Sequence, residues 1–266
     1  MKGRLFWCVA IALLSAFGGC QEDDTTGPGD ASGTGILVIR LTDAPAAYDA
    51  VNIAVDSVRV HVDSADSISG WHTISRSPAM YDLLQYMGGR DTIIAEGDIP
   101  AGYYTQLRLY IGAGSNVVVD GVTYDLEIPS GSQSGLKLNI QAVITEGVKY
   151  ELVLDFDASR SIVVTGNSRY QLKPVIKTLA TAVSGSLTVA VVPATANPTI
   201  WVIAGTDSSS SVADTTGLFR FKYLVPTMYS VRIVPGDPAY RETTLTNVNV
   251  FAGLNTEVGP IVLQPK

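Results

Sequence analysis

Cysteine is nearly absent from this chain, because its 266 residues contain only Cys8 and Cys20. Both stand near the amino terminus, so the sequence beyond residue 20 has no intramolecular disulfide available to it. A folded body built from that part must rest on a hydrophobic core, which an apolar content of 46% makes feasible. The same shortage excludes a zinc site built on thiolates.

Long apolar runs are also missing, except for one at the start of the chain. Residues 5–17 are almost wholly apolar, follow two basic residues and lead directly into Gly18, Gly19 and Cys20. This run is about a dozen residues long, whereas a helix that crosses a bilayer needs roughly 20. The pattern therefore predicts a cleavable signal peptide over residues 1–19 and not a transmembrane helix.

Basic residues are scarce, since 18 Lys and Arg stand against 25 Asp and Glu and give a net charge of −7. Removal of the signal peptide takes away Lys2 and Arg4 and makes the chain more acidic. No cluster of basic residues offsets this field, which would repel a polyanion. Nucleic acid is therefore excluded as an expected partner.

Catalytic side chains are few as well, because the chain has only two histidines. His61 alternates with Val60 and Val62, which predicts a place on the solvent face of a strand, and His72 is expected to pack locally beside Trp71. No Gly-x-Ser-x-Gly motif is present to carry a serine nucleophile. We therefore predict that the protein is not an enzyme, with a hydrolase that uses surface carboxylates as the less favoured alternative.

Helical periodicity is almost lacking, and short runs of period two take its place. The clearest run alternates over residues 148–156, and a change of phase at Asp56-Ser57 predicts a β-bulge or a bend within that strand. Asp120-Gly121 predicts a tight hairpin, since its glycine accepts a positive φ. Only Tyr81 to Met87 is expected to form a helical turn. The fold class predicted is all-β, with two β-sandwich domains of Greek-key, immunoglobulin-like or transthyretin-like type.

Composition also divides the chain into segments. Residues 20–34 are polar and rich in Gly, Thr and Asp, which predicts a disordered tether. Strand patterns then fill residues 35–180 and 183–266, and we expect one β-sandwich in each. Within the second, residues 206–211 (TDSSSS) are expected to form a polar loop.

Around Cys20 the sequence resembles the lipobox of bacterial lipoproteins, in which the cysteine thiol after the cleavage site receives a diacylglyceryl group. Gly18 and Gly19 occupy the small-residue positions before it. Residues 21–24 (QEDD) are similar to the acidic signal that sends some Bacteroidetes lipoproteins to the cell surface. The resemblance implies Cys20 as the lipidation site, a lipid bilayer as partner, and a lipid-anchored location on the bacterial outer membrane. It favours exposure at the cell surface, with a periplasm-facing location as the alternative.

Residues 35–177 resemble the domain of unknown function 4382 family, which occurs in bacterial lipoproteins and other exported proteins. Five ordered stretches carry the resemblance, namely residues 41–45 (LTDAP), 100–105 (PAGYYT), 129–131 (PSG) with 135–137 (GLK), 155–159 (DFDAS) and 172–175 (LKPV). The family brings no established activity. It therefore implies an exported β-domain and no particular reaction.

Residues 185–263 look like the carboxypeptidase regulatory-like, or transthyretin-like, β-sandwich. The resemblance is carried by residues 214–221 (DTTGLFRF), Leu224 and residues 229–231 (YSV). Such modules are classed with carbohydrate-binding-like folds, which by itself implies no sugar binding.

Three carboxylates form the candidate metal site. Asp155 and Asp157 stand two residues apart at the end of one predicted strand, where both side chains would point the same way, and Asp43 follows the first strand. Together they are candidate ligands for calcium, which takes six to eight oxygens and would need backbone or water oxygens as well. The competing interpretation is that they cap loops by accepting backbone hydrogen bonds or pair with Arg160.

Taken together, these features predict a non-enzymatic, membrane-anchored lipoprotein that presents a binding or structural β-sandwich surface to a glycan or a cell-surface protein. The alternative is a carbohydrate-binding accessory lipoprotein that stacks sugars on aromatic rings. Candidate rings for such stacking are Trp71, Tyr103, Tyr104, Tyr110, Trp201 and Tyr240. No cofactor is expected apart from the candidate calcium ion.

Overall fold

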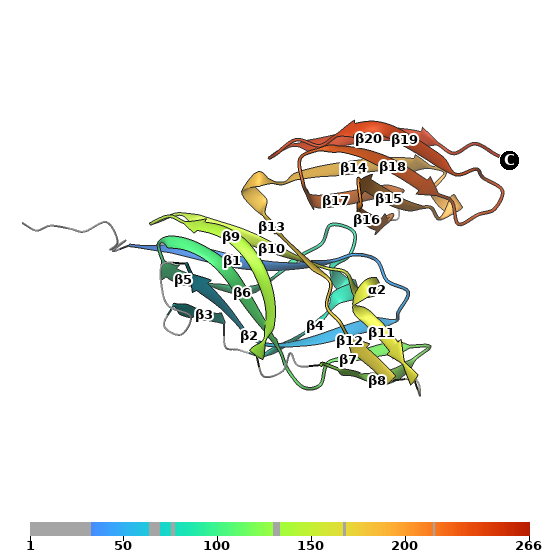
Figure 1. Ribbon diagram of the computed structural model, residues 1–266. Coiled ribbons are helices and arrows are strands. Elements are labelled where there is room, and N and C mark those ends of the chain that lie inside the picture. Colours follow the sequence, from blue (N-terminus) through green and yellow to red (C-terminus); the bar gives the residue numbers. More distant parts are fainter. Residues whose placement is uncertain (1–32, 64–69, 76–77, 130–133, 167–168, 215) are drawn as a thin grey trace, which may run out of the picture. The chain divides into compact units, whose positions relative to one another are not determined.

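The computed structural model describes residues 33–63, 70–75, 78–129, 134–166, 169–214 and 216–266 (Figure 1). The predicted signal peptide, Cys20 and most of the predicted tether lie outside these residues. Thr34 already begins strand β1. The described residues are mostly β-structure, which confirms the predicted all-β class.

The first thirteen strands form two sheets. A four-stranded sheet has the order β13-β10-β1-β5, and a larger sheet runs β11-β12-β8-β7-β2-β6-β9, with β3 and β4 paired to β2. The four-stranded sheet consists of β1 (Thr34–Asp43), β5 (Thr92–Pro100), β10 (Lys149–Phe156) and β13 (Ile176–Ala180). The larger sheet consists of β2 (Ala50–Val62), β3 (Trp71–Ser75), β4 (Ala79–Asp82), β6 (Gly102–Ile111), β7 (Asn116–Val119), β8 (Val122–Glu127), β9 (Leu136–Ile144), β11 (Ile162–Thr165) and β12 (Arg169–Leu172).

Alternating side chains explain how these two sheets pack. Leu152, Leu154 and Phe156 of β10 point into one hydrophobic cluster, together with apolar residues of β1, β2 and β6. β1 is buried on both faces, since Leu37, Val38 and Ile39 are all fully inaccessible. A strand flanked on both edges and covered on both faces is the centre of this part of the fold.

The last seven strands form a second pair of sheets, of orders β17-β14-β20 and β16-β15-β18-β19. Their inner faces share a hydrophobic cluster of their own, which includes Val189, Phe219 and Val231. The strands are β14 (Gly185–Val192), β15 (Thr199–Ala204), β16 (Asp207–Val212), β17 (Leu218–Leu224), β18 (Met228–Val234), β19 (Thr243–Asn249) and β20 (Asn255–Val262). Two separate hydrophobic clusters are consistent with two domains. The predicted domain boundaries, 35–180 and 183–266, stay a prediction.

Several local expectations are confirmed. The register of β2 against β6 shifts between Val55 and Ser57, as the change of phase predicts. Asp120 and Gly121 both adopt positive φ, 51° and 75°, between β7 and β8, which a tight hairpin turn requires. The expected helical turn is the 3-10 helix η1 (Leu83–Tyr86), and the Asp82 side chain caps it by accepting from the Leu84 amide.

One expectation is wrong, because residues 206–211 do not form a loop. Asp207–Val212 is strand β16, paired with β15 over its whole length. Its serines carry no apolar pattern, but an edge strand needs only backbone hydrogen bonds to one neighbour.

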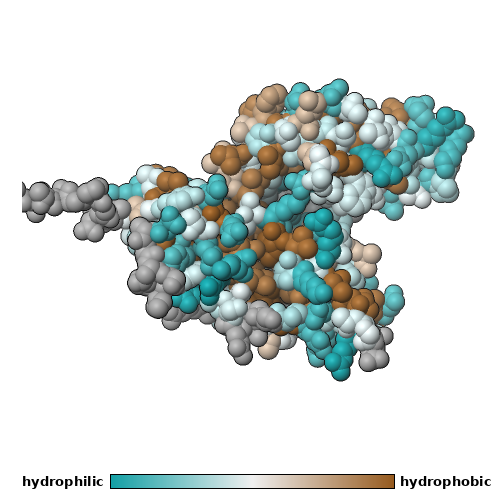
Figure 2. All heavy atoms as spheres, in the orientation of Figure 1, coloured by the Kyte–Doolittle hydropathy of each residue, from teal (hydrophilic) through white to brown (hydrophobic). Residues whose placement is uncertain are grey.

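Some apolar side chains are exposed at the surface, among them Val143 and Leu254. Figure 2 shows apolar patches between polar ones on one face.

The two hydrophobic clusters can be tested separately with one substitution in each. Phe156→Ala and Phe219→Ala each remove a fully buried ring and should lower the free energy of unfolding by about 3 to 5 kcal/mol. If residues 35–180 and 183–266 are separate domains, calorimetry should show each variant shifting a different transition. Val143→Ala, at a site that is 62% exposed, is the control. One common transition that both variants shift equally would contradict two independently folding domains.

Candidate functional site

The parallel pairing of β1 with β10 brings the predicted carboxylates to one edge of the four-stranded sheet. Thr42 lies opposite Asp155, and Asp43 lies opposite Phe156. Both strands end at this edge, and Asp157 follows immediately on β10. Asp43, Asp155 and Asp157 are therefore neighbours, although 112 residues of sequence or more separate the first from the others.

Asp43 is the most buried of the three, with a relative exposure of 5%. Its Oδ1 accepts a hydrogen bond from the Ala158 amide at 2.9 Å, whereas Oδ2 has no hydrogen-bond partner among the described residues. Burial raises the pKa of Asp43 to about 8, and the negative charges of Asp155 and Asp157 add to the rise. Near neutral pH this carboxyl group is mostly protonated.

Asp157 is the N-cap of the short helix α2 (Ala158–Ser161). Its Oδ1 accepts from the Arg160 amide at 3.1 Å and from the Ser159 hydroxyl at 2.7 Å, and its Oδ2 pairs with Arg160 Nε at 2.8 Å. Asp157 therefore caps α2 and pairs with Arg160, as the competing interpretation holds. The expectation that Asp155 and Asp157 lie on one strand is wrong, because β10 ends at Phe156 and Asp157 is the N-cap of α2.

Asp155 differs from both neighbours because it has no hydrogen-bond partner in the described part of the chain. Burial raises its pKa to about 6, while Lys177, its register partner on β13, opposes that rise. Within the described ranges, no three His, Cys, Asp or Glu side chains are gathered so that they could hold a metal ion. This arrangement gives no support to a calcium site on Asp43, Asp155 and Asp157, which stays a prediction.

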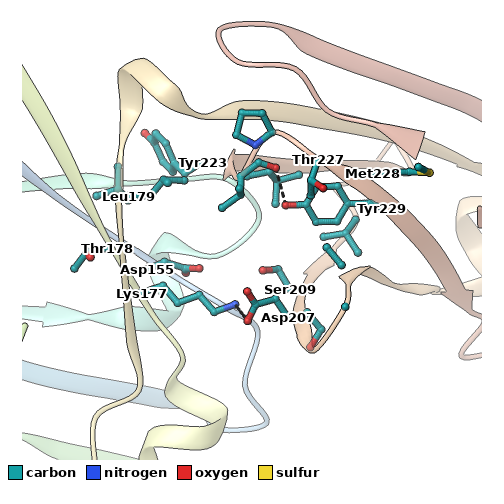
Figure 3. Close-up of a pocket in the computed structure, with 18 residues that line it drawn as sticks. Asp155, Lys177, Thr178, Leu179, Asp207, Ser209, Tyr223, Thr227, Met228 and Tyr229 are labelled. Carbon is teal, nitrogen blue, oxygen red and sulfur yellow. Dashed lines mark hydrogen bonds and ion pairs between the residues drawn. The ribbon is translucent and has the colours of Figure 1, made fainter. Parts of the chain in front are cut away.

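Asp155 lines a cavity of about 670 Å³ (Figure 3). Three consecutive residues of β13 and three of β16 border it, residues 177–179 and 207–209. Successive side chains of a strand point to opposite faces, so three in a row reach one cavity only where it meets the strand edge. β13 and β16 are each the end strand of their sheet. The cavity is therefore bordered by two open strand edges.

The cavity has a polar end and an apolar end. In Figure 3 the side chains of Asp155 and Ser209 point toward each other, and Lys177 Nζ pairs with Asp207 Oδ1 beside them at 3.5 Å. The segment 223–229 forms the opposite wall, where the Tyr229 hydroxyl donates to the Val225 carbonyl at 2.9 Å. Apolar walls come from Val153, Leu179, Val202, Leu224, Pro226 and Met228. This combination is typical of a small-molecule binding site.

Asp91 holds the wall of this cavity in place, and no sequence motif predicted this role. The carboxylate accepts from Arg40 Nη1 at 2.8 Å, from the Tyr223 hydroxyl at 2.8 Å and from Lys222 Nζ at 3.2 Å. Burial alone would raise the pKa of Asp91, but the hydrogen bonds from Tyr223, Lys222 and Arg40 outweigh it and lower the pKa. Tyr223 stands at φ 57° and begins the 223–229 segment. A residue in that conformation persists only where its surroundings hold it.

The remaining candidate residues do not converge on this cavity. His61 packs on Trp71 with ring centroids 5.0 Å apart, and the guanidinium carbons of Arg59 and Arg108 lie 5.6 and 4.5 Å from the same indole. Tyr104, one of the six candidate rings for sugar stacking, is fully buried. In the described part of the chain, no helix is both long enough and apolar enough to cross a membrane.

Comparison with protein families identifies the first part of the chain. The model of the domain of unknown function (DUF4382) family matches residues 34–174, more than half of the sequence. The chain belongs to this family. No curated protein shows significant similarity to it.

Comparison with solved structures finds distant likenesses. The Bacillus anthracis TIE protein is 14% identical with a TM-score of 0.23 over 87% of this chain, which spans about a third (34%) of that protein. The shaft pilin SpaA of Lactobacillus rhamnosus GG is 8% identical, with a TM-score of 0.24, 88% of this chain and 98% of the pilin covered. A putative adhesin from Bacteroides ovatus is 12% identical, with a TM-score of 0.24, 95% and 99% covered. Likeness at this level transfers no property to the present chain.

The burial of Asp43 has a consequence for stability. Its folded pKa of about 8 lies above the ordinary value of 3.8, so the folded state binds the proton more tightly than the unfolded state. The contribution of Asp43 to stability is therefore present below pH 4 and is lost as the pH rises toward 8. Asp43→Asn keeps the acceptor for the Ala158 amide without the charge. The variant should gain stability over the native chain as the pH rises from 5 to 9, measured by urea unfolding.

Asp125→Asn is the matched control, because Asp125 is exposed on β8. The difference in free energy of unfolding between this variant and the native chain should stay constant across the same pH range. If the free energy of unfolding of Asp43→Asn relative to the native chain is also independent of pH, the Asp43 carboxyl is ionised in the folded protein over this range.

Proposed function

We propose that this protein is an exported, lipid-anchored bacterial protein whose folded body binds a ligand and catalyses no reaction. The observation that carries the binding role is the cavity of about 670 Å³ with one polar end. Its volume falls in the range of small-molecule sites, which run from roughly 300 to 1,000 Å³. One wall, segment 223–229, begins at Tyr223, whose hydroxyl donates to Asp91, and this bond supports a site that is formed before any ligand arrives.

The anchor rests on Cys20 and the residues around it. One lipid chain binds a membrane only marginally, whereas the several chains of a mature bacterial lipoprotein hold it stably. The acidic residues 21–24 favour the outer face of the outer membrane. In this proposal the polar segment after Cys20 separates the folded body from the bilayer, and the body faces the medium outside the cell.

Substitution of the anchoring thiol tests this location. Cys20→Ala should abolish labelling by a radioactive fatty acid and move the protein from the membrane fraction to the soluble fraction. Cys8→Ala is the matched control and should leave both readouts unchanged, since Cys8 lies in the segment that cleavage removes. If Cys20→Ala stays labelled and bound to the membrane, another anchor holds the protein.

A hydrolase is the second candidate function, because two carboxylates line one cavity. Asp155 and Asp207 both border it, and the pKa of Asp155, at about 6, suits a general acid. Two features oppose this function. Lys177 already pairs with Asp207, and the apolar side chains of the cavity, among them Leu179, Leu224 and Met228, would leave the sugar hydroxyl groups beside them without hydrogen bonds.

Turnover assays separate the two functions. We expect the native chain to release no more chromophore from a panel of nitrophenyl glycosides and esters than Asp155→Asn does. Asp207→Asn should match both. Hydrolysis by the native chain that Asp155→Asn reduces by about a hundredfold or more, the typical contribution of a general acid, would establish the enzyme instead.

A further inference from the structure

Charge in the cavity is not balanced. The ionisable acids and bases that line it are Asp155, Asp207 and Lys177, which leaves two carboxylates for one ammonium group. Lys177 pairs with Asp207, whose side chain is 73% exposed at the mouth. Asp155 lies deeper, and no hydrogen bond reaches its carboxylate from the described residues. The charges of Lys177 and Arg160 lower its pKa, but burial outweighs them. Because neither side chain forms a hydrogen bond with it, the cost of burying this carboxylate is only partly offset.

The surroundings of Asp155 define what such a group would be attached to. Val153 lies two residues earlier on the same face of β10 and is fully buried, and Leu179 stands on the neighbouring strand β13. Val202, Leu224 and Met228 also line the cavity, and Met228 lies on the side away from Asp155 in Figure 3. A positive group at Asp155 would therefore carry an apolar body that extends along these side chains.

We propose that the cavity binds a small amphiphilic cation, an organic ammonium ion whose charged end meets Asp155 and whose apolar body fills the space toward Met228. This inference rests on the proposed function, because it names the class of ligand for the same cavity. The Ser209 hydroxyl faces Asp155 across the cavity and adds a hydrogen-bond acceptor for the ammonium group (Figure 3).

A metal ion fits the cavity less well than an organic cation. Calcium takes six to eight oxygen ligands, and no three acidic or histidine side chains in the described ranges are gathered to supply them. An ammonium group needs only about three acceptors, and it leaves its apolar substituent to occupy the remaining volume. The size and the apolar walls of the cavity have no role in binding a bare ion.

The test uses three probes of equal length and different charge, namely hexylammonium, 1-hexanol and hexanoate, titrated calorimetrically into the native protein. Hexylammonium should bind about ten- to a hundredfold more tightly than 1-hexanol, since a bond to a charged group adds that much. Hexanoate should bind more weakly than either. In Asp155→Asn the affinity for hexylammonium should fall to that of 1-hexanol, whose own affinity should not change.

Two further variants show whether a loss of binding comes from misfolding. Lys177→Gln removes the resident ammonium group and should strengthen hexylammonium binding, an increase that structural damage would not produce. Asp125→Asn, on an exposed strand position outside the cavity, should bind all three probes as the native chain does.

The outcomes distinguish the ligand class from the binding site itself. Equal affinity for hexylammonium and 1-hexanol, unchanged in Asp155→Asn, would overturn the cationic ligand and leave the proposed binding role intact. Binding of none of the three probes would overturn both the ligand class and the role of the cavity.

Discussion

The parallel pairing of β1 with β10 is the constraint on which the candidate site depends. Two parallel strands end at the same sheet edge, so the polar residues that follow each apolar run meet there. Asp43 and Asp155 come together in this way. β13 then pairs antiparallel with β10 and sets Lys177 opposite Asp155. A reversed β1 would place Asp43 at the far edge of the sheet and would leave Asp155 with a different set of neighbours.

A second constraint joins this sheet to the wall of the cavity. Asp91 lies between η1 and β5, Arg40 extends from β1, and Tyr223 belongs to β17. Arg40 also pairs with Glu151 of β10 at 3.1 Å, so the charges form a network and not an isolated surface pair. Hydrogen bonds between ionised, partly buried groups are stronger than those between neutral ones. The network therefore fixes segment 223–229, without which the cavity would lack one side.

The sequence predicted local features well and long-range ones poorly, for a physical reason. Alternation over residues 148–156 locates β10, and Asp120-Gly121 locates a turn, because both patterns depend on neighbouring residues. β16 was not predicted, because its serines show no apolar alternation. Backbone pairing with β15 is what holds it as a strand. The bond between Asp91 and Tyr223 joins residues 132 positions apart. No local pattern records such a contact, and so Asp155 could be named as a site residue while its cavity could not.

Burial acts differently on the two neighbouring carboxyl groups, and this difference shapes the site. Asp43 and Asp155 repel each other when both are ionised, so the proton goes to the group that loses more by being charged. That group is Asp43, whose pKa of about 8 exceeds the value of about 6 for Asp155. Near neutral pH Asp43 is therefore mostly neutral and needs no counterion, while Asp155 keeps its charge and faces the cavity. A cation bound at Asp155 would in turn offset part of the repulsion on Asp43 and lower its pKa. Occupation of the cavity by such a cation would thus be linked to protonation of the buried strand end through the same pair of residues.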